Sequence, residues 1–153
     1  KTLNLFLKWL FLCFLPNIAK KEDHVIHGKN CTCVVHRKGA TRAKSGQPVL
    51  VPGDMGTGSW LMEGMEGNQA FGSSCHGAGR LLSRTQAKKQ IDGNEVKMNL
   101  NDRGIMVHAN TPNILSEEAP DAYKDVDEVI RLTSSAGLAK PIARFDPLAV
   151  IKG

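Results

Sequence analysis

A glycine-rich stretch with one histidine, residues 72–80, is the part of this sequence best suited to chemistry. It reads Gly-Ser-Ser-Cys-His-Gly-Ala-Gly-Arg, so small residues flank His76 and Arg80 follows four positions later. Small side chains let a large ligand approach the backbone, and glycine permits the turns that this requires. A helix that begins just after such a turn offers unpaired N–H groups to an anion. His76 would then be a nucleophile or ligand beside a phosphate, with Arg80 as a fixed charge.

The spacing alone leaves this assignment open, since a histidine in a glycine-rich turn is often an ordinary loop residue. The same holds for the basic residues that follow. Arg80, Arg84 and Lys88 recur at four-residue spacing, so a helix over residues 81–90 would align them as one stripe. That stripe could follow a phosphate backbone, or it could be a plain exposed helix face.

The elements that must position these residues indicate a domain with both helices and strands. Helical segments are expected at 81–90, 95–102 and 126–136. In the last of these, Asp125 can cap the start and Gly137 can end the helix, while Val126, Val129, Ile130 and Thr133 mark one apolar face. Short strands bounded by glycine or proline are expected at 33–36, 48–51, 58–62 and 105–108, with a final two at 142–145 and 148–151.

Length and composition suit one soluble domain. The chain has 153 residues, 41 % of them hydrophobic, which is enough for a core and argues against global disorder. The net charge of +5 favours a polyanionic partner. Residues 20–44 are strongly basic, whereas residues 117–128 are acidic and are expected to form a solvated face.

The four cysteines, Cys13, Cys31, Cys33 and Cys75, do not have the spacing of a zinc site. Cys31 and Cys33 fall on one side of any strand, where a disulfide between them is rare. A reduced, intracellular protein is the simpler interpretation. Cys75 could help to bind a metal, but a small packing residue is the preferred reading.

The first sixteen residues differ from the rest. Residues 1–15 are dominated by Leu, Phe and Trp, end before Pro16, and are too short to span a bilayer comfortably. They are similar to the apolar part of a signal peptide, although the chain does not begin with Met. We expect this segment to come from a partial, divergent or wrongly joined gene, with a secretory signal as the alternative.

Several motifs in a fixed order, running from residue 17 to 153, resemble the C-terminal part of the RtcB family of GTP-dependent RNA ligases. The motifs that carry the resemblance are His36-Arg37-Lys38-Gly39-Ala40-Thr41-Arg42, Gly46-Gln47-Pro48-Val49, Pro52-Gly53-Asp54-Met55-Gly56-Thr57, the 72–80 stretch, Glu118-Ala119-Pro120-Asp121-Ala122-Tyr123-Lys124-Asp125-Val126 and Ile151-Lys152-Gly153. The resemblance implies the C-terminal portion of an α/β (α+β) fold with a mixed sheet. It also implies an enzyme that joins RNA 3′-phosphate, or 2′,3′-cyclic phosphate, to 5′-hydroxyl ends.

The resemblance makes His76 the residue that attacks the α-phosphate of GTP. The nucleotide contacts carried over by motif are Asn17, Pro52, Gly53, Asp54, Met55, Ser59, His76, Gly77, Ala78, Gly79, Arg80 and Lys152. Asp54 stands where many members have serine, which weakens that assignment. Lys38 and Arg42 could contact RNA, or they could lie in a solvated loop. Lys152 could instead belong to a frayed terminus, and His24, His27 and His108 receive no role.

Three departures bear on activity. Family members bind Mn²⁺ through an N-terminal part that this sequence lacks and through a histidine replaced here by Pro16, so no metal ligand is assigned. A longer proline-rich loop usually separates Ala43 from Gly46, and only Lys44 and Ser45 remain. We therefore expect an inactive chain when it is alone, with a non-catalytic nucleotide- or RNA-binding module as the alternative.

The resemblance also implies partners and a location. GTP and RNA, either tRNA halves or broken RNA, are the expected partners, with accessory proteins left open and no membrane. The catalytic unit is expected to be monomeric and intracellular, in the cytoplasm or, in a eukaryote, also in the nucleus.

Overall fold

The computed structural model describes residues 18–153, so the apolar segment 1–16 and Asn17 lie outside the described part. The strands are β1 Ile18–Ile26, β2 Lys29–Arg37, β3 Ala40–Arg42, β4 Pro48–Val51, β5 Ser59–Gly64, β6 Ser73–Cys75, β7 Met106–Ala109, β8 Ala139–Phe145 and β9 Ala149–Lys152. The helices are α2 Arg84–Gln90, α3 Gly93–Asp102, α4 Pro112–Glu117 and α5 Val126–Ser135, with a short 3-10 turn, η1, at Pro120–Ala122. The structure combines helices with small antiparallel sheets and one parallel pair of strands, which confirms the expected α+β class.

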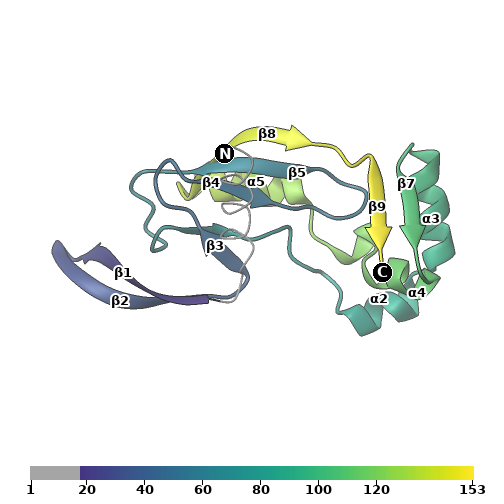
Figure 1. The fold of residues 1–153 in the computed structure, drawn as a ribbon, viewed down its shortest axis with the longest axis horizontal. Coiled ribbons are helices and arrows are strands. Elements are labelled where there is room, and N and C mark those ends of the chain that lie inside the picture. Colours follow the sequence, from purple (N-terminus) through teal and green to yellow (C-terminus); the bar gives the residue numbers. More distant parts are fainter. Residues whose placement is uncertain (1–17) are drawn as a thin grey trace, which may run out of the picture.

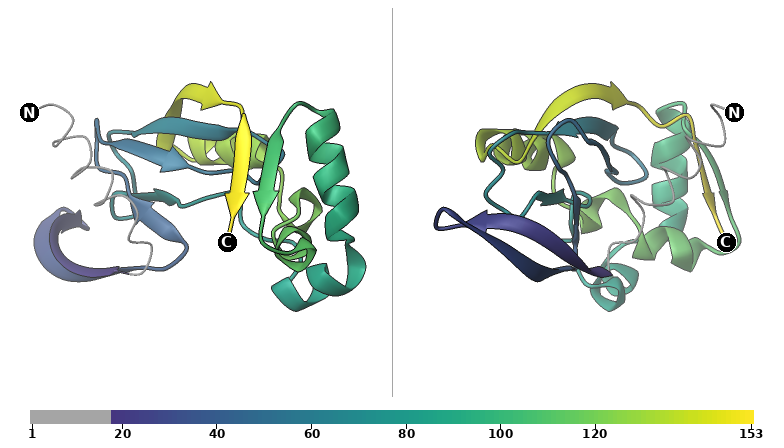
Figure 2. Two further views of the ribbon diagram at one scale, coloured as in Figure 1. Left: turned by 45° about the vertical axis from the view of Figure 1, so that its right-hand side comes forward. Right: turned by 60° about the vertical axis from the view of Figure 1, so that its left-hand side comes forward.

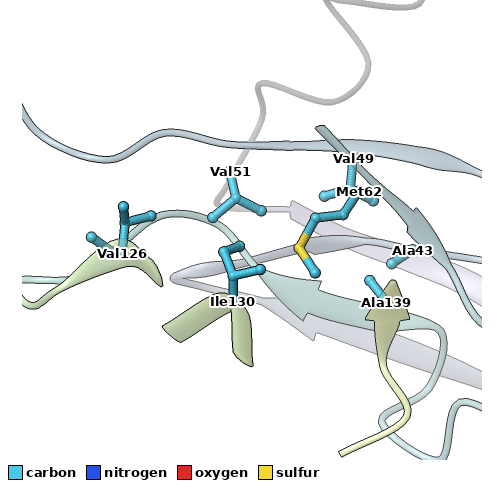
Figure 3. Close-up of a cluster of buried hydrophobic side chains, with 8 residues drawn as sticks. Ala43, Val49, Val51, Met62, Val126, Ile130 and Ala139 are labelled. Carbon is cyan, nitrogen blue, oxygen red and sulfur yellow. The ribbon is translucent and has the colours of Figure 1, made fainter. Parts of the chain in front are cut away.

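A three-stranded antiparallel sheet, in the order β4-β5-β8, forms one half of the core with α5. Figure 3 shows the side chains of Val51, Met62 and Ile130 pointing toward one another between the sheet and the helix. Helix α5 lies where the sequence predicted a helix. The predicted cap is also present, since the Asp125 side chain accepts a hydrogen bond from the Asp127 N–H at the helix start. Gly137 follows its end in the left-handed region, at φ +69°.

A second apolar cluster lies where α3, α4 and the β7–β9 pair meet, at the end of the molecule opposite to β1 and β2 (Figure 1). Leu100 and Leu115 are its largest fully buried side chains. The pair β7–β9 is parallel, with Met106 opposite Ala149 and Ala109 opposite Lys152. The last two predicted strands therefore exist but join different sheets, because β8 pairs with β5 and β9 pairs with β7.

A long hairpin of β1 and β2 extends away from the rest of the chain (Figure 2). Only part of β2 was expected, and β1 was not. The two-residue turn has positive φ at both His27 (49°) and Gly28 (75°), as a type I′ hairpin requires. At the base of the hairpin, the Arg37 guanidinium pairs with Glu22 at 2.8 Å, with both side chains almost fully buried.

The connection between β3 and β4 is a tight turn. Gln47 N–H donates to the Lys44 carbonyl at 2.8 Å, and Gly46 takes a positive φ of 73°. The Gln47 side-chain oxygen accepts hydrogen bonds from Arg42 Nε and Lys44 N–H, at 3.2 and 3.4 Å. Local hydrogen bonds thus hold this short connection in one shape. Within residues 18–153, no helix is both long and apolar enough to cross a membrane.

Candidate nucleotide-binding site

A cavity of about 310 Å³ borders the second apolar cluster, which contributes Met55 and Val150 to its wall. Six of the twelve predicted contact residues line it. These six are Pro52, Gly53, Asp54, Met55, Ser59 and Lys152. The other lining residues are Glu118, Tyr123, Pro147, Ala149, Val150 and Ile151. The wall thus combines the segment after β4, the start of β5, the η1 region and β9, which are far apart in the sequence.

The turn after β4 is shaped by Asp54. Its Oδ1 accepts hydrogen bonds from the Gly56 and Thr57 N–H groups at 2.7 and 3.0 Å, and its Oδ2 accepts one from the Thr57 hydroxyl at 2.8 Å. Arg103 donates to the Gly56 carbonyl from the other side. The Asp54 carboxylate is therefore occupied within its own turn, and what the turn presents to the cavity is largely backbone.

Gly53 in this turn has no room for a side chain. A Cβ there would lie 2.2 Å from the Gly58 carbonyl oxygen, so the backbone on either side could not keep its path. The close approach brings residue 53 against the segment that leads into β5, where Ser59 is half-buried.

Lys152 is held by strand pairing. It lies opposite Ala109 in the parallel β7–β9 pair, and its carbonyl accepts a hydrogen bond from Asn110 N–H at 3.1 Å. The alternative of a frayed terminus is therefore wrong. No ion pair engages its ammonium group within residues 18–153, which leaves a cation at the cavity wall.

The His76 loop is attached to the same cavity wall through Pro52. Ala78 N–H donates to the Pro52 carbonyl at 3.1 Å, and a Cβ at Gly77 would lie 3.3 Å from that oxygen. Gly79 has φ +77°, and its carbonyl accepts a hydrogen bond from Lys124 N–H at 3.0 Å. The half-buried His76 imidazole has no hydrogen-bond partner among the described residues. The loop is thus fixed by its backbone, while the imidazole stays available.

Cys75, which ends β6, packs against the first core cluster and accepts a hydrogen bond from the Thr133 hydroxyl at 3.4 Å. This confirms its expected packing role. Cys31, Cys33 and Cys75 are free thiols.

The predicted helix 81–90 begins later than expected, at Arg84. The Leu81 and Leu82 N–H groups donate to the Ala122 carbonyl at 2.8 and 3.3 Å, which keeps these two residues out of the helix. Ser83 then caps the helix in a capping box with Gln86. The expectation of a helix N-terminus directly behind the His76 loop is therefore wrong, because the first free N–H groups are used by Ala122 and Ser83.

Arg80 is engaged by protein groups. Its Nε donates to the Leu82 carbonyl at 2.9 Å, and its Nη1 donates to the Tyr123 hydroxyl at 2.9 Å. The guanidinium carbon lies 4.8 Å from the centre of the Tyr123 ring, and Nη1 approaches the Glu118 carboxylate at 3.4 Å. Arg80 thus holds two residues of the cavity wall in place.

The predicted basic stripe is also corrected. Arg80 lies outside the helix. The other two residues of the stripe, Arg84 and Lys88, lie on α2 and form ion pairs with acidic residues at the C-terminal end of α4. Arg84 Nε lies 3.1 Å from Glu117, and Lys88 Nζ lies 2.6 Å from the same carboxylate. The pKa of the Glu117 carboxyl is lowered, and the hydrogen bond from Lys88 is the largest cause. Glu117 therefore belongs to a charged contact between helices and not to a solvated face, as its position in the sequence suggested.

Of the six lining residues that the sequence analysis missed, two have polar side chains, Glu118 and Tyr123. The Tyr123 hydroxyl donates to the Glu118 carboxylate, and burial, followed by this hydrogen bond, raises the pKa of Tyr123. Both belong to a motif used for the resemblance, but the sequence alone gave no reason to bring them beside residues 52–55. Their position depends on the Arg80 contacts.

Other predicted residues lie elsewhere. Asn17 and Pro16 are outside the described part. Lys38 is exposed just after β2, and the Arg42 side chain donates a hydrogen bond to Gln47, which does not line the cavity. Among residues 18–153, no three His, Cys, Asp or Glu side chains come together in a way that could hold a metal ion. The described residues therefore do not fit a Mn²⁺ site.

The family model described as "tRNA-splicing ligase RtcB" matches residues 12–153. The chain belongs to the RtcB family. Three relatives show how similar it is to proteins of this family. The tRNA-splicing ligases RtcB of Thermococcus kodakarensis and Nanoarchaeum equitans are each 49 % identical to it, over 90 % of this chain and 32 % of their own length. That of Pyrococcus horikoshii is 47 % identical, over 90 % of this chain and 18 % of its own length.

The chain therefore spans about a fifth to a third of the length of these relatives. The alignments run over 152 positions and cover 90 % of this chain. The relatives thus carry residues with no counterpart here.

Proposed function

We propose that this chain is the nucleotide-binding and nucleophile-bearing part of a GTP-dependent RNA ligase. The observation that carries the proposal is the convergence of six residues, chosen by motif alone, on one cavity whose wall is hydrogen-bonded to the His76 loop. The names of the relatives, which are tRNA-splicing ligases, support RNA as the substrate.

In the proposed reaction, a His76 ring nitrogen attacks the α-phosphorus of GTP. A P–N bond forms, the P–O bond to the β-phosphate breaks, and pyrophosphate leaves. An oxygen of the RNA 3′-phosphate then attacks the same phosphorus and releases His76, which gives a 3′-end activated by GMP. The 5′-hydroxyl of the second RNA attacks the 3′-phosphate, loses its proton, and displaces GMP.

The cavity residues have distinct tasks in this reaction. The backbone of the 52–55 turn and the Ser59 hydroxyl would orient the nucleotide, and the Lys152 ammonium would neutralise negative charge. Gly77, Ala78 and Gly79 let the phosphates lie against the backbone next to His76. Arg80 would serve as a phosphate ligand only by releasing Glu118, so its first task is to keep Tyr123 at the cavity wall.

The chain alone is proposed to be inactive or nearly so. Charge neutralisation on the phosphates is a major part of phosphoryl-transfer catalysis, and the described residues supply no metal site for it. The alternative is a non-catalytic module that binds nucleotide or RNA in the same cavity without forming the P–N bond.

Labelling with α-³²P-GTP and Mn²⁺ tests this proposal, on the chain alone and on the chain fused to the N-terminal part of a family member. We expect acid-labile label on the fused protein, its loss in His76→Ala, and its retention in the control His108→Ala, which removes an exposed histidine. Label that survives in His76→Ala would refute the nucleophile. Nucleotide binding without any label on the fused protein would favour the alternative module.

A further inference from the structure

Arg103, at the C-terminal end of α3, contacts the turn after β4 from outside the cavity. Its Nη2 donates a hydrogen bond to the carbonyl of Gly56. Its backbone N–H bonds to the Leu100 carbonyl at 3.2 Å, so the residue is itself attached to α3. Arg103 does not line the cavity of about 310 Å³ that the turn helps to form. Its contact with the cavity wall therefore passes through the turn.

Gly56 is closely surrounded by side chains of α3 and η1. A Cβ at this position would lie 2.8 Å from Arg103 Nη1, 3.1 Å from Pro120 Cγ and 3.3 Å from Leu100 Cδ2. The guanidinium thus fills part of the space beside a buried glycine. Pro120 begins η1, which leads directly to Tyr123 in another part of the cavity wall. Two parts of the wall, the turn and the η1 region, therefore meet at the guanidinium of Arg103.

Hydrogen bonds inside the turn fix its shape but do not fix its place. The Asp54 carboxylate accepts from the Gly56 and Thr57 N–H groups, and the Asp54 N–H donates to the Thr57 hydroxyl at 3.2 Å. All of these bonds join residues of the turn to one another. Among residues 18–153, the bond from Arg103 is the one hydrogen bond that joins residues 54–57 to another element. The Gly56 carbonyl is therefore the point at which α3 holds the turn.

We infer that Arg103 is a positioning residue of the nucleotide site, which holds the backbone of residues 52–55 where a nucleotide requires it. We take the nucleotide to be GTP, which rests on the proposed function. Groups that contact a ligand must be kept within about half an ångström of the productive geometry by the residues behind them. Without Arg103, the Gly56 carbonyl would lose its partner, and the turn would keep its shape but shift relative to η1.

The position of Arg103 predicts an effect on GTP binding and not on the attack by His76. The His76 loop has a support of its own, since Ala78 N–H donates to the Pro52 carbonyl at 3.1 Å. Pro52 directly follows β4, so this support lies at the other end of the turn from Gly56. Loss of the Arg103 contact should therefore weaken the ground state and the transition state equally, which raises KM and leaves kcat unchanged.

Labelling of His76 with α-³²P-GTP, in the chain fused to the N-terminal part of a family member, measures both quantities. In Arg103→Ala, we expect the half-saturating GTP concentration to rise about tenfold, the effect of losing a hydrogen bond from a charged group. The rate at saturating GTP should not change. Arg103→Lys keeps the charge and a donor but not the planar guanidinium, so its rise should be smaller. The matched control is Arg131→Ala, which removes an equally exposed arginine from α5 and should change neither quantity.

Gly56→Ala tests the same contact from the other side. Its added Cβ would displace the guanidinium of Arg103, which is the far end of a flexible side chain. We expect this variant to raise the half-saturating GTP concentration as well. The double variant with Arg103→Ala should bind GTP no more weakly than the weaker of the two single variants, because both remove one contact. Effects that multiply in the double variant would show that Arg103 acts elsewhere, and would overturn the positioning role.

Two further results would overturn the positioning role of Arg103. One is native half-saturation in Arg103→Ala, and the other is an equal effect of Arg131→Ala. Anisotropy of a fluorescent GTP analogue should show the same loss of affinity without any labelling step, so a native protein that binds GTP but takes up no label would refute the proposed reaction and still test Arg103. Urea unfolding shows which variants fold, and Arg103→Lys with Gly56→Ala replaces Arg103→Ala if that variant does not.

Discussion

At the scale of single residues, the candidate site depends on positions where a side chain cannot be added. We expect Gly53→Ala to destabilise the chain by several kcal/mol and to abolish nucleotide binding, because its Cβ would meet the Gly58 carbonyl at 2.2 Å. Urea unfolding and a fluorescent GTP analogue measure the two effects. The matched control is Gly104→Asn, where open space surrounds a φ of +78° that asparagine tolerates. Equal stability of the two variants would contradict the close approach.

The Tyr123 hydroxyl connects Arg80 to Glu118. Tyr123→Phe keeps the ring next to the guanidinium but removes a hydroxyl that donates to one partner and accepts from the other. We expect a loss of about 1–2 kcal/mol in the free energy of unfolding, measured in urea. Tyr123→Leu should lose more, because it also removes the ring under Arg80. A Tyr123→Phe variant as stable as the native chain would show that the hydroxyl is not part of the network.

At the scale of elements, the base of the β1–β2 hairpin makes stability depend on pH. The hydrogen bond from Arg37 lowers the pKa of Glu22 from 4.5 to about 2. A carboxyl group with a depressed pKa contributes its stability fully above pH 4.5, and the contribution is lost as the pH falls toward 2. We expect a loss on the order of 3 kcal/mol over this window, measured by urea unfolding between pH 6 and pH 2.

Glu22→Gln provides the comparison for this pH dependence. The variant lacks the titrating group, so it should be less stable near pH 6 and show a flatter curve between pH 4.5 and 2. A native chain whose curve matches that of Glu22→Gln would rule out the buried pair as the cause.

Helix α5 was predictable because its signals are local. Asp125, the apolar face from Val126 to Thr133, and Gly137 all lie within one short segment. The start of α2 was not predictable, because the Leu81 and Leu82 N–H groups bond to Ala122, some forty residues away. The hairpin strand β1 was missed because its charged residues mask the alternation, and one of them, Glu22, is buried only through its pairing with Arg37.

The candidate site was predictable only by resemblance. Motifs selected the six cavity residues, but neither spacing nor periodicity could place residues 52–55 beside Lys152. That contact follows from the parallel pairing of β9 with β7. Glu118 and Tyr123 were missed for the same reason, since their place in the wall involves contacts with Arg80, which is about forty residues away in the sequence.

At the scale of the whole molecule, an exposed apolar surface follows the end of the chain. Phe145, Leu148 and Ile151 are 52 %, 80 % and 80 % exposed, and Met106 on the neighbouring strand is 70 % exposed. We expect the chain alone to bind a hydrophobic dye and to self-associate at micromolar concentration. Fusion to the N-terminal part of a family member should reduce both, as measured by dye fluorescence and light scattering. Undiminished dye binding in the fused, folded protein would contradict a covering role for that part.

The position of β9 has a consequence for how the molecule opens. The strand belongs to the second apolar cluster, yet it continues directly from β8 of the three-stranded sheet, so residues 146–148 join two separately packed bodies. Detaching β9 would remove one wall of the cavity while both bodies keep most of their apolar contacts. Amide protons of β9 should therefore exchange with solvent through a partial opening that requires less free energy than global unfolding. A ligand bound in the cavity should slow the exchange of these amides selectively.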